Sequence, residues 1–176
     1  KIHLPAADYK LTHTTRSGRG VYSFCMCPGG FVVNASSEEG RLAVNGMSNY
    51  DRAECNANSA IVVTVKPEDF ACFGQTEDTP LAGVEFQRQL ERMAYQEGKG
   101  LIPVQLLQDF KDKKTSIGFG SILPNTKGAY NTANLHQCLP EFVSEALLEG
   151  MTEFANKIPG FDREDALLEG VESRTS

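Results

Sequence analysis

The sequence predicts an α+β fold in which an antiparallel β meander, formed by the N-terminal half, packs against a helical C-terminal half. Residues 1–70 favour strands, because bulky and small side chains alternate and β-branched residues are frequent. Residues 79–160 favour helices, because apolar residues recur at helical spacing, and residues 166–174 are expected to return as a strand. A chain of 176 residues is long enough for a core of its own, so we expect one domain over 1–176.

Short apolar runs separated by turn residues predict the strands of the meander. From Val21 to Cys27 alternate side chains point to opposite faces, as in a strand. Pro28-Gly29-Gly30 then predicts a hairpin turn, because glycine tolerates the positive φ angles of tight turns, and 31–35 is the expected return strand. Residues 36–40 form a second turn. The remaining predicted strands are 9–15, 41–47 and 59–65.

The second half of the chain predicts helices. Thr79-Pro80 is a favourable helix start, and the helix over 79–98 would bury a face formed by Leu81, Val84, Leu90 and Ala94. A shorter helix is expected at 104–111 and a loop at 115–129. Pro140 opens the clearest helix, 140–158, because apolar residues recur along it at helical spacing. Its acidic row, expected to face solvent, is Glu141, Glu145, Glu149 and Glu153.

Charge and composition exclude several classes of protein. The net charge is -6, and residues 141–176 carry all of this excess, so the basic face of a nucleic-acid-binding protein is absent. Apolar runs stay well below the roughly 20 residues that span a bilayer, and no targeting segment opens the chain. Five cysteines, an odd number spread over the chain, indicate free thiols in a reducing compartment. We therefore expect a cytoplasmic protein without nucleic-acid or membrane partners.

Cys25 and Cys27 have three possible roles. Residues two apart in a strand face the same way, so the two side chains can simply pack side by side before the turn. The thiols can also serve redox chemistry or face a substrate, or they can share a soft metal. A structural zinc site needs four ligands, commonly from two closely spaced pairs, and the sequence lacks a second pair. We therefore predict no metal site.

Binding motifs for nucleotides are also missing. Gly118-Phe119-Gly120 has neither the third glycine nor the following helix of a dinucleotide-binding fingerprint. Polar residues are dense in the loop 45–52, where Arg52 either clamps an anionic ligand or is a surface side chain. The residues alone assign no catalytic group.

Six segments of the chain resemble those of one family: CMCPGG at 25–30, NGMS at 45–48, NANSAIVV at 56–63, PLAGVEFQRQLE at 80–91, CLPEFVSEALLEG at 138–150 and GVESRTS at 170–176. The chain resembles the uncharacterised bacterial FAD-dependent dehydrogenases, which are described as NAD(FAD)-utilising. The similarity extends over nearly the whole chain. Members of this family are much longer proteins, in which the Rossmann-like FAD domain is split in sequence and a segment like this one is inserted.

The resemblance implies that this chain is the inserted, substrate-side domain, excised from a longer flavoprotein, which would agree with the missing initial Met. It implies FAD in the full-length protein, none bound to this fragment, and the FAD-binding domain of the same polypeptide as partner. The fragment would then be inactive alone, and its substrate is unknown. A non-enzymatic protein-interaction domain, with 140–158 as docking surface, is the alternative. The expected substrate-facing residues are Cys25, Cys27, Pro28, Gly29, Gly30, Asn45, Met47, Arg52 and Asn58.

Overall fold

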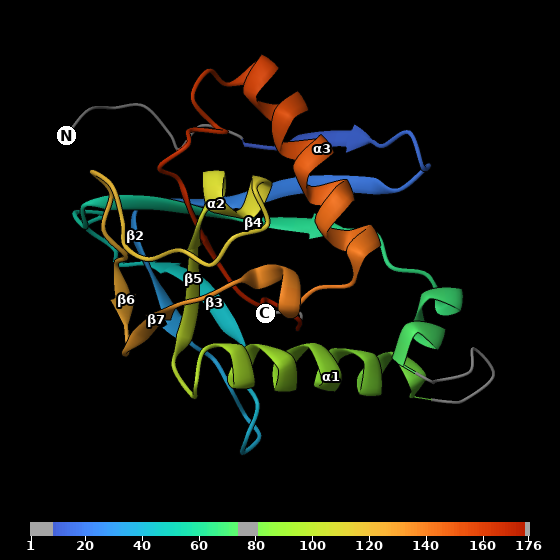
Figure 1. The fold of residues 1–176 in the computed structure, drawn as a ribbon. Coiled ribbons are helices and arrows are strands. Elements are labelled where there is room, and N and C mark those ends of the chain that lie inside the picture. Colours follow the sequence, from blue (N-terminus) through green and yellow to red (C-terminus); the bar gives the residue numbers. More distant parts are fainter. Residues whose placement is uncertain (1–8, 74–80, 175–176) are drawn as a thin grey trace.

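A computed structural model, which describes residues 9–73 and 81–174, shows an α+β fold of two sheets and three α-helices in that part of the chain (Figure 1). The predicted fold class is confirmed. The first sheet contains β1 (Leu11–Thr14), β2 (Gly20–Asn34), β3 (Val44–Ser48), β4 (Asn56–Val63) and β6 (Thr126–Lys127). The second sheet contains β5 (Ile102–Leu106), β7 (Tyr130–Thr132) and β8 (Leu167–Glu169). The helices are α1 (Ala82–Glu97), α2 (Leu107–Lys111) and α3 (Glu141–Lys157).

The long strand β2 is the central strand of the first sheet, since β1, β3, β4 and β6 all pair with it. The predicted hairpin within it is wrong. Residues 21–27 and 31–35 do not pair with each other, because the chain continues through Pro28-Gly29-Gly30 as one long strand without reversing. Its pairing with β4 shifts register between Phe24 and Cys27 and again between Cys27 and Gly30. Cys25 (φ 55°) and Gly29 (φ 59°) have left-handed backbone at these bulges. The turn-forming residues therefore bend a strand and do not reverse it.

Antiparallel partners flank β2 along its length. β1 pairs with the start of β2, β4 pairs with it from Val21 to Gly30, and β3 pairs with its end, where Phe31 lies opposite Met47. A short parallel strand, β6, joins at Val32 and Val33. The strands predicted at 9–15, 41–47 and 59–65 are thus confirmed, with shifted ends, and the loop predicted at 115–129 contains β6.

The second sheet was not predicted. Residues 104–106 belong to β5, which pairs in parallel with β7 and antiparallel with β8, so the helix expected at 104–111 begins only at Leu107. The side chains from Ile102 to Gln105 are all buried, because the strand is covered on both faces. The predicted returning strand is observed as β8, which is shorter than 166–174.

Helix α1 buries two of the four predicted residues, Leu90 and Ala94, together with Phe86, which was not predicted. Leu81, by contrast, is 76% exposed and Val84 is 37% exposed. The predicted cap, Thr79-Pro80, lies outside the described residues. The buried face also contains Glu91, an acid inside the core whose partner is described below.

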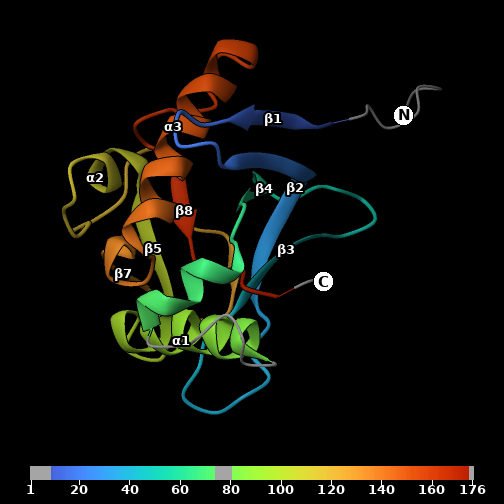
Figure 2. The ribbon, with the colours of Figure 1, turned by 90° about the vertical axis from the view of Figure 1, so that its right-hand side faces the viewer.

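Helix α3 confirms the prediction and lies across the first sheet, close to β1, β2 and β4 (Figure 2). Phe154 and Ala146 pack with Val21 and Leu11 in a small core cluster. The acidic row is not wholly solvated, because Glu149 Oε1 lies 3.1 Å from His13 Nε2 and accepts the Arg16 backbone N–H at 3.0 Å. No helix among residues 9–73 and 81–174 is long and apolar enough to cross a bilayer.

The contact between α3 and β2 depends on a glycine. A Cβ added at Gly150 would lie 2.5 Å from Val21 Cγ1, and both residues are buried. Gly150→Ala is therefore expected to lower the free energy of unfolding by about 1–3 kcal/mol through overpacking. We expect this loss of stability although alanine has a higher helix propensity than glycine, by about 1 kcal/mol. Urea denaturation measures the change.

Two further variants test this reason. Gly118→Ala should leave stability unchanged, because its added Cβ would meet nothing within 4 Å. In the Gly150→Ala background, Val21→Ala should be less damaging than in the wild type, because it removes the methyl groups that clash. If the two effects instead add, the clash is not the cause.

Candidate functional site

A cavity of about 1030 Å³ lies between the first sheet, α1, α3 and the C-terminal segment. Figure 2 shows β8 and the residues after it running between α3 and the strands β3 and β4. Most of the lining is apolar and comes from all four parts: Val32, Val44 and Ile61 from the sheet, Phe86 and Leu90 from α1, Leu147 and Met151 from α3, and Leu167, Leu168 and Val171 from the C-terminal segment. A space of this size and character suits a small organic ligand.

The charged side chains of the cavity are carboxylates. Glu169 and Glu172 line it, whereas no Lys, Arg or His is found among the lining residues in the described part of the chain. Burial raises the pKa of Glu169 to about 7, and it also raises the pKa of Glu172. Glu169 Oε2 is shut off from solvent and has no hydrogen-bond partner within residues 9–73 and 81–174. The cavity therefore combines apolar walls with one unsatisfied buried carboxyl group.

One end of the cavity is built where β2, β3 and β4 meet. Asn58 Nδ2 donates to the backbone oxygens of Phe31 (3.2 Å) and Met47 (3.4 Å). A Cβ at Gly46 would overlap Asn58 Oδ1, and one at Gly30 would lie 2.5 Å from the Met47 oxygen. The two glycines thus make room for the Asn58 carboxamide, and Gly30, Gly46 and Asn58 all line the cavity. The asparagine and the glycines act as one structural unit.

The loop after β3 folds back on the bulged part of β2. The Glu54 N–H donates to the Gly29 oxygen at 3.3 Å, and the Arg52 backbone lies so close that a Cβ at Gly29 would overlap its oxygen. Asn125 Nδ2 donates to the Gly30 oxygen at 3.0 Å and to Glu54 Oε2 at 3.1 Å. The Arg52 side chain is exposed. Gly29 and Arg52 are therefore neighbours through their backbones.

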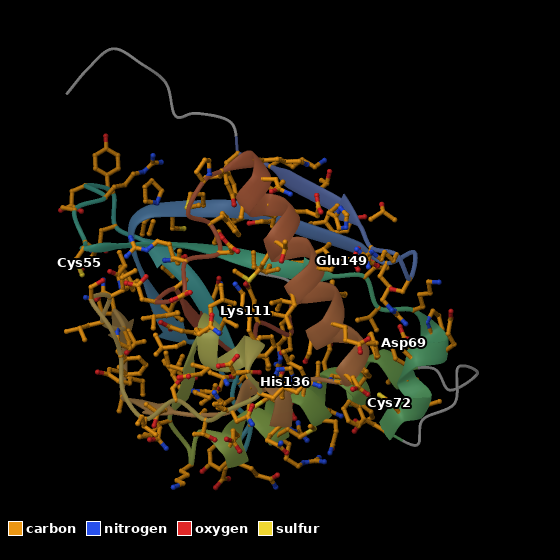
Figure 3. All side chains as sticks on the ribbon, turned by 45° about the horizontal axis from the view of Figure 1, so that its top comes forward. Cys55, Asp69, Cys72, Lys111, His136 and Glu149 are labelled. Carbon is orange, nitrogen blue, oxygen red and sulfur yellow. The ribbon has the colours of Figure 1, made fainter. Side chains whose placement is uncertain are left out.

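The cysteines are dispersed. Cys25 is exposed at a bulge, and Cys27 Sγ lies 3.6 Å from the Cys25 oxygen. Cys55 and Cys72 lie on opposite sides of the molecule (Figure 3), and burial raises the pKa of Cys138 to about 12. Over residues 9–73 and 81–174, no three His, Cys, Asp or Glu side chains are grouped to hold a metal ion.

The predicted site residues fall into two groups. Gly30 and Asn58 line the cavity. The other predicted residues lie on or beside the bulged segment of β2 but outside the lining: Cys25, Cys27, Pro28, Gly29, Asn45, Met47 and Arg52. Neighbouring Met26 and Phe31 do line the cavity, so this segment borders one end of it. Sequence reasoning missed Glu169, whose signal is a single acid within the apolar run Ala166–Val171.

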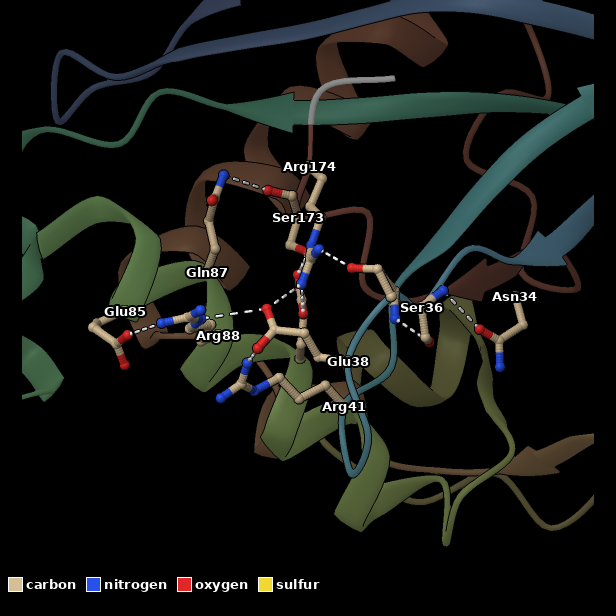
Figure 4. Close-up of polar contacts among 12 residues, drawn as sticks. Asn34, Ser36, Glu38, Arg41, Glu85, Gln87, Arg88, Ser173 and Arg174 are labelled. Atoms are coloured by element: carbon tan, nitrogen blue, oxygen red, sulfur yellow. Dashed lines mark hydrogen bonds and ion pairs between the residues drawn. The ribbon is translucent and has the colours of Figure 1, made fainter. Parts of the chain in front are cut away.

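A cluster of polar side chains holds the C-terminal segment against α1 (Figure 4). The Glu91 carboxylate is fully buried and accepts from Arg174 Nε and Nη2, both at 2.6 Å, and from Ser173 Oγ at 2.6 Å. Hydrogen bonds from these groups keep the pKa of Glu91 low despite burial. Gln87 Nε2 donates to the Ser173 oxygen at 2.7 Å. These contacts hold the segment that follows β8, and thus Glu169, beside α1 and the cavity.

Comparison with known proteins gives two matches. The model of a family described as "FAD-dependent protein, C-terminal domain-like" matches residues 1–175. An uncharacterized protein of Clostridium beijerinckii is 51% identical over 179 residues, which cover 100% of this chain and 32% of that protein. The chain thus spans about a third of the length of this relative.

Proposed function

Because the chain belongs to the family of FAD-dependent protein, C-terminal domain-like sequences, we propose that it is the substrate-side domain of a larger FAD-dependent oxidoreductase. Its partner in this proposal is an FAD-binding part of the same polypeptide, for which the greater length of the Clostridium beijerinckii relative leaves room. The reaction is proposed to be a dehydrogenation. Free thiols at all five cysteines suit a bacterial cytoplasm as its location.

The cavity carries the proposal. Its volume of about 1030 Å³ and its mainly apolar lining suit an organic substrate. Its walls come from the sheet, from two helices and from the C-terminal segment, so the whole domain supports the site. The bulged segment of β2 borders one end, and we propose that Cys25, Cys27, Pro28 and Gly29 form the rim there, beside Asn45, Met47 and Arg52.

The charged groups of the cavity favour a ligand other than FAD. FAD carries a diphosphate, which proteins bind with helix N-termini, glycine-rich loops or cationic side chains. The charged groups found in the lining are the carboxylates of Glu169 and Glu172, which would repel phosphate. We therefore propose that FAD is held by the other part of the longer polypeptide and that this chain alone neither retains FAD nor is active.

The test is the visible spectrum of this chain after incubation with FAD and removal of free flavin by gel filtration. We expect no flavin band, because the cavity repels the diphosphate. The matched control is the full-length Clostridium beijerinckii relative, which should keep a flavin band under the same treatment. A stoichiometric flavin band on this chain alone would overturn the proposal.

A further inference from the structure

Glu169 is the one acid that β8 presents to the cavity. It lies opposite Val104 of β5, and Leu167 and Leu168 beside it are apolar. Its Oε2 atom finds no hydrogen-bond partner among the described residues, while the side chain lines the cavity. A buried carboxyl oxygen without a partner is unfavourable, because it has lost its hydrogen bonds to water and gained none in return. A ligand that supplies the partner removes this penalty.

The surroundings favour a positive partner. The lining residues of the described chain include no Lys, Arg or His that could neutralise Glu169, and the other charged residue is the acid Glu172. Apolar walls strengthen electrostatic interactions, because the local dielectric constant is low. The carboxyl torsion of glutamate is soft, so either oxygen can turn towards a bound group. An anion would meet only like charge there.

We propose that the cavity binds a hydrophobic amine, whose ammonium group pairs with Glu169 and whose hydrocarbon part occupies the apolar space between the first sheet, α1 and α3. This inference names the substrate class of the same site and rests on the proposed function. The ammonium supplies the missing donor to the carboxylate. The hydrocarbon part gains free energy in proportion to the apolar surface that it buries. An alcohol of equal size gains from the burial of its hydrocarbon part but forms no ion pair with Glu169. A carboxylate of equal size gains from the same burial but is repelled by Glu169.

The test compares three ligands with the same alkyl chain and different charge: octylamine, octan-1-ol and octanoate. Isothermal titration calorimetry with this chain at neutral pH measures each affinity. We expect octylamine to bind about ten- to hundredfold more tightly than octan-1-ol, as charge-assisted hydrogen bonds imply, and octanoate to bind most weakly. Equal binding of amine and alcohol, tighter binding of octanoate, or no binding of any ligand would overturn the inference.

Two variants connect the preference to Glu169. Glu169→Gln should abolish the advantage of octylamine over octan-1-ol and leave the alcohol unchanged. Glu164→Gln removes the same formal charge from an exposed position outside the lining, so it should keep the full advantage. An amine preference that survives Glu169→Gln would show that the ammonium does not pair with this residue.

A pH series adds a second readout. Glu169 has its pKa near 7, and Glu172 is the other carboxyl group in the lining. Octylamine affinity should therefore rise between about pH 5.5 and about pH 8.5, as Glu169 ionises, and the rise should be much smaller in Glu169→Gln, where Glu172 is the carboxyl group left in the lining. None of these measurements involves flavin. If the chain prefers octylamine through Glu169 yet retains FAD, the ligand class stands and the substrate-side proposal fails. If it retains no FAD and shows no amine preference, the ligand class fails alone.

Discussion

Replacing Arg174 with alanine is expected to lower the free energy of unfolding by about 3–5 kcal/mol. Its guanidinium group holds both oxygens of Glu91 at 2.6 Å, and the Glu91 carboxylate is fully buried on α1. Without Arg174, Ser173 Oγ remains as a donor, but the carboxylate has lost the guanidinium group that contacts it, and Arg41 acts on it only through its charge. The loss is large because a buried, unpaired charge is more unfavourable than the intact pair is favourable. Urea denaturation measures it.

The protein contains a matched control for this variant. Arg163 also forms a two-pronged pair, with Nε and Nη2 each 2.8 Å from an Asp165 oxygen, but the arginine is exposed. Arg163→Ala should therefore change stability far less than Arg174→Ala, although the geometry removed is nearly the same. Equal losses would contradict the role given to burial.

A double variant separates the two parts of the Arg174 effect. Glu91→Leu combined with Arg174→Met replaces the pair with apolar groups and leaves no buried charge. It should recover most of the stability lost in Arg174→Ala, because well-packed apolar residues can replace a buried pair at little loss. This variant also provides a folded protein for comparison if Arg174→Ala alone does not fold.

The main strands of the first sheet and helix α3 were predictable because their local patterns are strong. Alternation over 21–27 and the β-branched run SAIVV at 59–63 predict strands, and helix 140–158 follows from regular apolar spacing. The segment that follows residues 21–27 was predicted wrongly. Pro28-Gly29-Gly30 suits a hairpin turn and a bulge equally well by composition. Pairing with β4, which comes much later in the chain, decides for the bulge, and the positive φ of Cys25 has no sequence signal.

The second sheet shows the same limit. Ile102–Leu106 is a short apolar run that a buried helix and a buried strand would share. Its state is set by pairing with β7, which was not predicted, and with β8, which lies about 60 residues later in the chain. Local propensity is outweighed here by backbone pairing with distant residues.

The candidate site was predictable at one end only. Gly30 and Asn58 stood out because CMCPGG and NANS are unusual segments, and both residues line the cavity. The cavity itself is lined by residues from Met26 to Ser173, so no local window contains it. An acid in the run ALLEGV is visible in the sequence, but the absence of a partner for its Oε2 atom is a spatial fact.

The contribution of Glu169 to stability is expected to become unfavourable as pH rises from about 4.5 to about 7. Burial raises its pKa from 4.5 to about 7 in the folded chain. Below about pH 4.5 the group is protonated in both states, so it does not disfavour folding. Between the two values the unfolded chain releases a proton that the folded chain keeps, which favours unfolding by up to about 3 kcal/mol. Above about pH 7 this loss stays constant.

The variant Glu169→Gln isolates this contribution, because glutamine keeps the shape and does not ionise. The stability of Glu169→Gln minus that of the wild type should grow from near zero at about pH 4.5 to about 3 kcal/mol near pH 8. The opposite dependence of Glu91, whose low pKa favours folding at higher pH, is common to both proteins and cancels in the difference. Urea denaturation across this pH range measures the difference, with exposed Glu164→Gln as the control that should follow the wild type. A constant difference between Glu169→Gln and the wild type would mean that the carboxyl group is solvated or paired in the folded chain. Octylamine would then have no unpaired partner to find in the cavity.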